Sequence, residues 1–180
     1  MTDMENSTCD KPYTSTDKWT ASIISGLTFL IVSSPYTYSL TNSLVNSTTK
    51  IVGKSAADVL PSAVGSTVLK GANTTESSGC PSTTGIMIHS VAYMLIIRIM
   101  MEKRNFAGCK KPYNSKDKWV ASSIGGLMFL VISSPFLYNT VNELTSKLGL
   151  ETVDEDGCPN VQGLLLHTAV FIVATRILMY

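Results

Sequence analysis

Apolar residues along the chain are gathered into four blocks that polar segments separate. The blocks lie at residues 19–38, 85–101, 119–138 and 163–180. Each block has 17 to 20 residues, and about 20 helical residues cross the hydrocarbon core of a bilayer. The pattern therefore predicts an all-α membrane protein with four transmembrane helices. Residues 1–18 are polar and of mixed charge, which favours a retained signal-anchor over a cleaved signal peptide.

The sequence also contains an internal repeat. Residues 9–47 align with residues 109–147 at an offset of 100, and more than half of the aligned positions are identical. Residues 79–101 align with the segment that starts at Gly157, where the offset falls to 78. The first unit therefore has 22 additional residues, which lie in its loop. Each unit contains two spans, so both enter the membrane in the same direction, as two tandem, parallel-repeat helical hairpins.

The repeat sets the predicted domain organisation. The segments are a polar N-terminal segment at 1–18, repeat 1 at 19–101, a basic connector at 102–118 and repeat 2 at 119–180. Within the repeats, the predicted elements are helix 19–44, loop 45–80, helix 81–101, helix 119–146, loop 147–158 and helix 159–180. Pro35 and Pro135 predict a kink or helix end near the outer leaflet, because proline removes a backbone donor. Beyond each proline we expect the helix to resume outside the membrane.

Charge differs between the loops on the two sides of the predicted membrane. The connector contains Lys103, Arg104, Lys110, Lys111, Lys116 and Lys118 against Glu102 and Asp117. The loop of repeat 2 contains Glu143, Glu151, Asp154, Glu155 and Asp156 against Lys147. Loops rich in lysine and arginine stay in the cytosol. We therefore expect the termini and residues 102–118 on the cytosolic side, and the acidic loop on the opposite side.

The four cysteines divide between the two membrane faces. Cys9 and Cys109 precede the first span of each unit, and Cys80 and Cys158 precede the second. Pairing within a unit is excluded, because the two sulfur atoms would lie on opposite sides of the bilayer. The candidate disulfide is Cys80–Cys158 on the non-cytosolic side. A Cys9–Cys109 bond is less favoured, because it would face the reducing cytosol.

Histidine and arginine are the ionisable residues inside the predicted spans. His89 and His167 occupy equivalent positions about a third of the way in from the outer face. Three interpretations remain open for the imidazoles: hydrogen bonds to a neighbouring helix, proton relay or gating, and paired axial ligation of a haem. In the first, the partners are hydroxyls at similar depth, on Ser33, Ser34, Ser133 or Ser134. Arg98 and Arg176 lie near the cytosolic ends of their spans and are interpreted as interfacial anchors.

Small residues recur at helical spacing in the first span of each unit. Ser22 and Gly26 are four residues apart, as are Ser122 and Gly126. Two small residues at this spacing let membrane helices approach closely. We therefore expect the first and third spans to form the central helix–helix contact.

Composition removes several classes of function. Charged residues make up 15% of the chain and its formal net charge is +1, whereas soluble domains carry about 25% charged residues. A near-neutral chain gives no electrostatic reason to expect nucleic acid as a partner. The sequence has no glycine-rich phosphate loop, no zinc-protease motif, no nucleophile elbow and no carboxylate within its spans. We therefore expect no enzyme activity, no cofactor, no metal and no small-molecule substrate.

One composite motif carries a family resemblance. It is DKW-x-x-S-x-x-x-G-L-x-F-L-x-x-SSP-x-x-Y-x-x-x-N-x-L, followed by G-C-P-x-x-x-G-x-x-x-H and an arginine-bearing helix. This motif resembles small membrane proteins of large nucleocytoplasmic DNA viruses, here as two fused units that cover most of the chain. The resemblance implies a virion protein of the inner membrane, derived from the host endoplasmic reticulum. Its implied role is a minor capsid component that ties the shell to the bilayer, with lipid and major and minor capsid proteins as partners.

Under this interpretation, the basic segments that precede the first and third spans would dock on the shell. The capsid-docking candidates are Lys11, Lys18, Lys110, Lys111, Lys116 and Lys118. The alternative is a small transporter, channel or haem-binding redox carrier that uses His89 and His167. A third hypothesis is a subunit of a membrane-remodelling or fusion complex.

Overall fold

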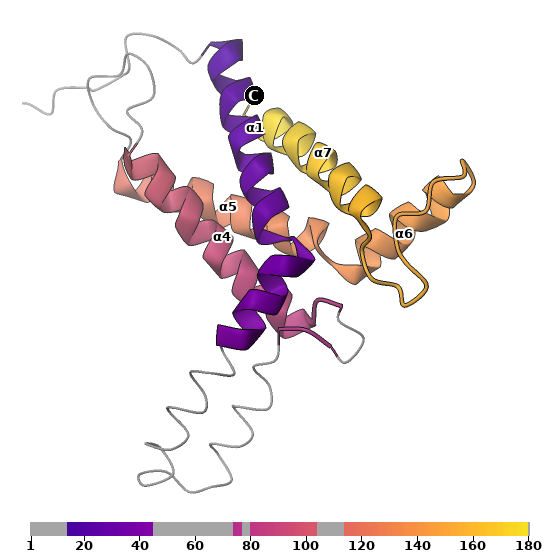
Figure 1. Ribbon diagram of the computed structural model, residues 1–180. Helices are drawn as coiled ribbons and strands as arrows, with labels where there is room; N and C mark the ends of the chain where they lie inside the picture. Colours follow the sequence, from indigo (N-terminus) through magenta and orange to yellow (C-terminus); the bar gives the residue numbers. More distant parts are fainter. Residues whose placement is uncertain (1–13, 45–73, 77–79, 104–113, 180) are drawn as a thin grey trace, which may run out of the picture.

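The helices account for all the regular secondary structure in the described part of the chain, and loops with isolated β-bridges connect them. The computed structural model describes residues 14–44, 74–76, 80–103 and 114–179 (Figure 1). Its helices are α1 (Ser15–Val32), α4 (Thr83–Lys103), α5 (Ser115–Ile132), α6 (Pro135–Ser146) and α7 (Val161–Leu178), with a further helical segment at Pro35–Leu44. Helices α4 and α7 are each long and apolar enough to cross a membrane. Helices α1 and α5 pass the same test when each is joined to the helix that follows it.

Local sequence explains where α1 and α5 begin. Thr14 accepts a hydrogen bond from the backbone N–H of Asp17, and the Asp17 carboxylate accepts one from the N–H of Thr14. This reciprocal capping box satisfies two backbone donors that a helix start leaves open. Asn114 caps α5 with its side-chain oxygen. Both helices therefore begin four residues before the predicted starts at Trp19 and Trp119.

The predicted helices 19–44 and 119–146 are each divided at a proline. Pro35–Leu44 is bent by 56° from α1, and α6 is bent by 56° from α5. Ser134 caps α6, and Pro135 occupies the first turn, where a missing N–H costs nothing. The break is thus a helix end followed by a new helix start in both repeats.

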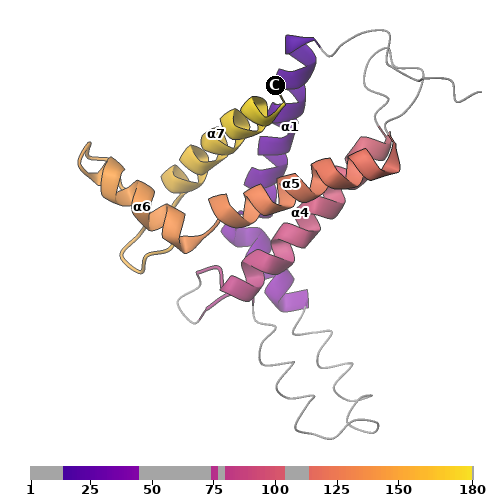
Figure 2. The ribbon, with the colours of Figure 1, turned by 180° about the vertical axis from the view of Figure 1, so that it is seen from behind.

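The helices pack in two pairs, and each pair contains one helix from each repeat. Helix α1 of repeat 1 packs along α7 of repeat 2, and α4 of repeat 1 packs along α5 of repeat 2 (Figures 1 and 2). Contacts between α1 and α4, and between α5 and α7, are fewer. The first helix of each repeat therefore has its main interface with the second helix of the other.

The predicted central contact between the first and third spans is wrong. A Cβ atom at Gly26 would meet the side chain of Ile172 on α7, and one at Gly126 would meet Met94 and Ser90 on α4. Both glycines allow close helix packing, but against second-span helices. The physical reason is that a small-residue motif lets a neighbour approach and does not select which neighbour.

An aromatic cluster joins the two helix pairs at the centre. Phe29, Tyr93, Phe129 and Phe171 are fully buried and come from α1, α4, α5 and α7 respectively. The Phe29 and Phe171 rings stack with centroids 4.6 Å apart, and the Phe29 and Phe129 rings meet edge to face at 5.3 Å. This is where α1 and α5 touch.

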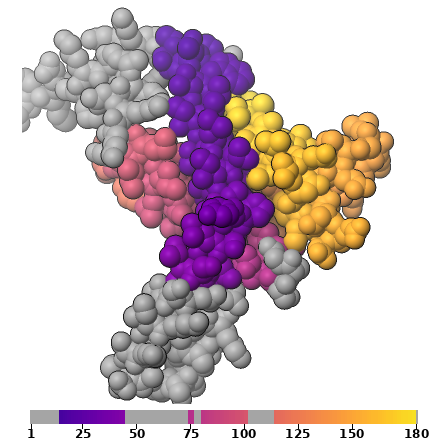
Figure 3. All heavy atoms as spheres, in the orientation of Figure 1, coloured from indigo at the N-terminus to yellow at the C-terminus, as the bar shows by residue number. Residues whose placement is uncertain are grey.

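The outward faces of the long helices are apolar. Exposed side chains include Ile23, Leu27 and Ile31 on α1, Met87, Val91 and Leu95 on α4, Ile124, Leu127 and Val131 on α5, and Leu165, Val170 and Val173 on α7. In the space-filling view, α1 lies across the middle of one face with α7 beside it (Figure 3). Apolar surface on this scale is typical of contact with a membrane or partner rather than with water.

Candidate functional site at the disulfide-linked end

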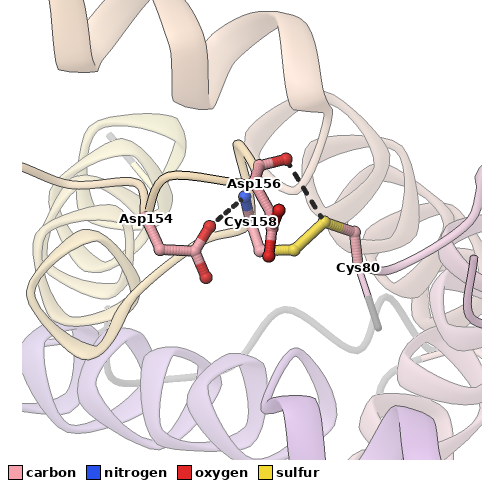
Figure 4. The surroundings of a disulfide bond; sticks show 4 residues. All are labelled: Cys80, Asp154, Asp156 and Cys158. Carbon is pink, nitrogen blue, oxygen red and sulfur yellow. Dashed lines mark hydrogen bonds between the residues drawn. A yellow bond between two sulfur atoms is a disulfide. The ribbon is translucent and has the colours of Figure 1, made fainter. Parts of the chain in front are cut away.

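A disulfide joins the two repeats at the end of the bundle where α4 and α7 begin. Cys80 and Cys158 are bonded, with Cα atoms 5.1 Å apart (Figure 4). The N–H of Cys158 donates to the carboxylate of Asp154 at 2.7 Å, which holds the loop of repeat 2 in a tight turn. The bond is the cross-repeat pairing that the sequence favours. Cys9 and Cys109 lie outside the described residues.

Each loop returns to its own bent helix through an asparagine and a threonine. The side-chain oxygen of Asn142 accepts from the N–H and the hydroxyl of Thr152, at 2.8 and 3.1 Å. In repeat 1, Asn42 accepts from the N–H of Thr74 at 3.3 Å, and the Thr74 hydroxyl donates to the carbonyl of Tyr38 at 3.0 Å. Sequence analysis missed both threonines. The signal was the repeated pattern T-x-[ED]-x-x-G-C-P, which begins before the aligned segment.

Two equivalent glycines let these loops lie against the following helices. A Cβ atom at Gly85 would overlap the carbonyl oxygen of Thr74, and one at Gly163 would overlap that of Thr152. The atom met is backbone in both cases, so the neighbour cannot move aside by changing a rotamer. The glycine of the G-C-P-x-x-x-G motif is therefore explained by close approach.

We expect Gly163→Ala to lower the free energy of unfolding by about 1–2 kcal/mol. Overpacking costs about 1–3 kcal/mol, and the higher helix propensity of alanine returns up to about 1 kcal/mol. The measurement is thermal or denaturant unfolding of the detergent-solubilised protein, with Gly85→Ala as the second site. Gln162→Ala, at an exposed position one residue earlier, serves as control. Stabilisation by Gly163→Ala would show that the space is open.

The buried histidines bind the broken ends of α1 and α5. His89 Nδ1 lies 2.7 Å from the carbonyl oxygen of Val32, and His167 Nδ1 lies 2.8 Å from that of Ile132. A carbonyl only accepts, so Nδ1 carries the proton in both rings. Helix ends leave carbonyls without intrahelical donors, and the imidazole N–H groups supply the missing donors. The expected serine hydroxyls are not the partners, since each acceptor is the backbone carbonyl one residue before the Ser-Ser pair.

A tyrosine from the bent helix covers each imidazole. Tyr38 stacks on His89 with ring centroids 3.8 Å apart, and Tyr138 stacks on His167 at 3.7 Å. Both histidines are buried, at 2% and 1% exposure. Each ring therefore fastens three elements of its repeat: the end of the first span, the bent helix and the second span.

The two histidines differ at their second nitrogen. His89 Nε2 lies 3.1 Å from the hydroxyl of Thr41, which also lies 2.8 Å from the Thr37 carbonyl, so one proton serves two acceptors. His167 Nε2 is buried and has no partner among the described residues. The repeat explains the difference, because position 141, the equivalent of Thr41, is valine.

We expect Val141→Thr to stabilise the protein by about 0.5–1 kcal/mol, because it offers His167 Nε2 a donor. Thr41→Val should destabilise it by a similar amount. Unfolding of both variants and of the double exchange measures this. If Val141→Thr destabilises the protein as much as Thr41→Val does, the lack of a donor for His167 Nε2 has no cost in stability.

At the opposite end of each helix pair, an arginine of one helix makes a cation–π contact with a tryptophan of the other. The Arg98 guanidinium lies over the Trp119 ring, 5.6 Å from its centroid, and Arg176 lies over Trp19 at 5.5 Å. Arg98 also donates to the Ser115 hydroxyl at 3.3 Å. Cation–π pairs of this kind contribute about 0.5–1 kcal/mol when exposed. The arginines thus join α4 to α5 and α7 to α1.

The predicted docking lysines have different environments. Lys116 is exposed and Lys18 is half-buried, whereas Lys118 is only 7% exposed. Lys118 lies on the inward face of α5 with Ser122 and Gly126, so the prediction that it docks on a partner is wrong. Lys11, Lys110 and Lys111 lie outside the described residues.

The contacts described at this site join helices and loops of the two repeats to one another. Within the described ranges, no group of three or more histidine, cysteine, aspartate or glutamate side chains is placed to hold a metal ion. The fold is that of an all-helical protein with two to four helices able to span a membrane. The sequence matches no protein-family profile, no curated protein and no solved structure.

Proposed function

We propose that this chain is a structural membrane protein: a minor capsid component that anchors the shell of a large DNA virus particle to its inner lipid membrane. The observation that carries the proposal is that the repeats are fastened to each other at both ends. The disulfide joins them at one end, and the arginine–tryptophan pairs join them at the other. An anchor needs a rigid body with apolar outer faces, and it needs no active site.

The disulfide supports one orientation of this anchor. Disulfides persist in oxidising compartments such as the lumen of the endoplasmic reticulum. The exposed acidic side chains Glu151, Asp154, Glu155 and Asp156 lie in the same loop as Cys158. The arginine–tryptophan end, with exposed Lys116 and the basic connector 102–118, then faces the cytosol. In a particle assembled from that membrane, this basic end meets the shell.

Purified particles provide the test. Non-ionic detergent removes the lipid, the shells are sedimented, and lysine-reactive crosslinking identifies what remains bound. We expect the protein to stay with the shell and to crosslink through Lys116 and the connector lysines. Charge reversal at Lys110, Lys111 and Lys116 should reduce incorporation into particles, whereas Lys147→Glu, at the opposite end, should leave it unchanged. Release with the lipid, or equal incorporation of both variants, would refute the shell-anchor role.

A second candidate is the small transporter, channel or haem-binding redox carrier. The buried Nε2 of His167, without a partner among the described residues, is the observation that favours it. This candidate predicts a pH-dependent conductance in liposomes or a haem Soret band. Either signal should disappear in the His89→Ala/His167→Ala protein if the histidines carry it.

A further inference from the structure

A cavity of about 190 Å³ opens at the disulfide-linked end of the bundle, between the two repeats. Both repeats contribute to its lining, which consists of Ser33, Pro35 and Pro81 from repeat 1 and Asp154, Cys158, Pro159 and Leu164 from repeat 2. Ser33 and Leu164 are buried, whereas Pro35 and Asp154 are exposed. The cavity therefore reaches from the surface of the protein to the packed helices.

The lining residues, all in the described part of the chain, offer acceptors to the cavity but no free donor. Three of the seven are prolines, which have no backbone N–H group. The backbone N–H groups of the other four already donate to oxygen atoms of the chain. The Ser33 hydroxyl donates to the carbonyl of Phe29 at 2.6 Å, so its oxygen acts only as an acceptor toward the cavity. A polar ligand of this cavity must therefore supply the donors.

Asp154 gives the cavity a negative charge, and no basic side chain is among the lining residues. The N–H of Asp154 donates to the carbonyl of Cys158 at 2.9 Å, and its carbonyl accepts from the N–H of Gly157 at 3.0 Å. One carboxylate oxygen accepts from the N–H of Cys158, and the other points away from that bond (Figure 4). The carboxylate is thus held in place with one oxygen open to a cationic donor, which reduces the cost of ordering it on binding.

The size of the cavity limits the ligand to a small group. A cavity of about 150 Å³ in a protein core can hold benzene, whereas pockets for drug-sized ligands have about 300–1,000 Å³. A volume of about 190 Å³ therefore suits a group of roughly six to eight non-hydrogen atoms. An ammonium group on a short aliphatic arm has this size, and its methylene groups suit the proline and leucine walls.

The position of the cavity indicates where such a group comes from. Ser33 and Pro35 lie at the break that follows α1, and Pro81 and Pro159 lie shortly before α4 and α7 begin. When α4 and α7 cross a bilayer, their ends lie beside the polar headgroup layer. The small cations of that layer are the ammonium groups of phospholipids. Ethanolamine and choline headgroups both place an ammonium on a two-carbon arm.

We propose that this cavity binds the primary ammonium of a phosphatidylethanolamine headgroup, with the Asp154 carboxylate as its counter-ion and the Ser33 oxygen as a further acceptor. A primary ammonium has three N–H donors, as a lysine side chain does, and its hydrogen bonds to a carboxylate are charge-assisted. Choline has the same charge but no N–H group. A lining that only accepts hydrogen bonds therefore selects ethanolamine over choline. The inference depends on the spans crossing a bilayer and not on a capsid role.

Competition between two lipids tests the proposal. The full-length, disulfide-bonded protein in non-ionic detergent receives equal amounts of dioleoyl phosphatidylethanolamine and dioleoyl phosphatidylcholine, and native mass spectrometry counts each bound lipid. Asp154→Asn removes the charge and keeps an acceptor for the N–H of Cys158. Glu155→Gln makes the same change of charge at the neighbouring exposed position, which does not line the cavity, and is the matched control. Leu164→Phe places a ring in the cavity and leaves Asp154 unchanged.

We expect the protein to prefer phosphatidylethanolamine by about three- to fivefold, the range of a partly exposed ion pair. Asp154→Asn and Leu164→Phe should abolish the preference, and Glu155→Gln should retain it. Equal binding of the two lipids would overturn the proposal, as would a preference that survives Asp154→Asn or is lost equally in Glu155→Gln.

Soluble phosphoethanolamine, which has the same ammonium group but no acyl chains, separates a lipid from a free amine as the ligand. We expect it to displace the bound lipid only at concentrations far above that of the lipid. Displacement at equal concentration would assign the cavity to a free amine and overturn the lipid assignment. None of these outcomes bears on the shell-anchor proposal, which is tested on particles.

Discussion

Loss of the Cys80–Cys158 bond should lower the free energy of unfolding by about 4 kcal/mol. The two cysteines are 78 residues apart in sequence. Closing a loop of this length removes conformational entropy from the unfolded chain equivalent to about 4 kcal/mol at room temperature, in the loop-entropy account of disulfides. This is a large fraction of the stability of a typical domain. Unfolding of the solubilised protein with and without a reductant measures the loss.

Serine substitutions separate this effect from that of reductant on other thiols. Cys80→Ser and Cys158→Ser should each cost as much as reduction, and the double variant should cost no more than either single one, because one bond is lost in all three. The Cys9→Ser/Cys109→Ser protein provides the matched control and should retain its sensitivity to reductant. Additive losses from the two single variants would mean that each cysteine contributes separately.

The disulfide was accessible to sequence reasoning because geometry left few pairings. Cys80 and Cys158 occupy equivalent places in a repeat, and residues related by a pseudo-twofold axis meet when they lie near it. The breaks at Pro35 and Pro135 were equally accessible, since proline removes a backbone donor wherever it occurs. These features depend on covalent structure or on one residue type, so a single sequence displays them.

The partners of the helices and histidines were not accessible in the same way. Gly26 and Gly126 indicate that another helix packs closely against each of them. The sequence around Gly26 does not show whether that helix is α5 or α7. The acceptors of His89 and His167 are backbone carbonyls, and a carbonyl carries no sequence signature. Their availability follows from the proline break, but only the packing of the second span against it brings the imidazole within reach.

Lys118 shows a further limit of pattern reasoning. The connector is rich in basic residues, and a run of basic residues usually forms a solvated surface. The α-helical period nevertheless places Lys118 on the same face as Ser122, Gly126 and Phe129, which is the buried face of α5. The same period places Lys116 on a different face of the helix, where its side chain is exposed.

Phe29→Ala should destabilise the bundle by about 2–3 kcal/mol. Phe29 touches both Phe171 and Phe129, as Tyr93 does from α4, so it is one of two rings that join the helix pairs. In soluble cores this substitution costs about 3–5 kcal/mol, part of which is transfer from water. Lipid tails are as apolar as a leucine side chain, so the transfer part is absent and the cavity and lost ring contacts remain.

Leu27→Ala, two residues earlier on the exposed side of α1, is the matched control. It should change stability by less than about 0.5 kcal/mol, because its exposed side chain has the same apolar surroundings in detergent whether the helices are packed or separated. Phe129→Ala should cost about as much as Phe29→Ala, and the double variant should cost less than the sum, because the two rings are in contact. Unfolding in detergent, followed by fluorescence, measures all four variants. Equal effects of Leu27→Ala and Phe29→Ala would contradict a bundle held together at this aromatic cluster, and would indicate that general apolar character holds the helices together.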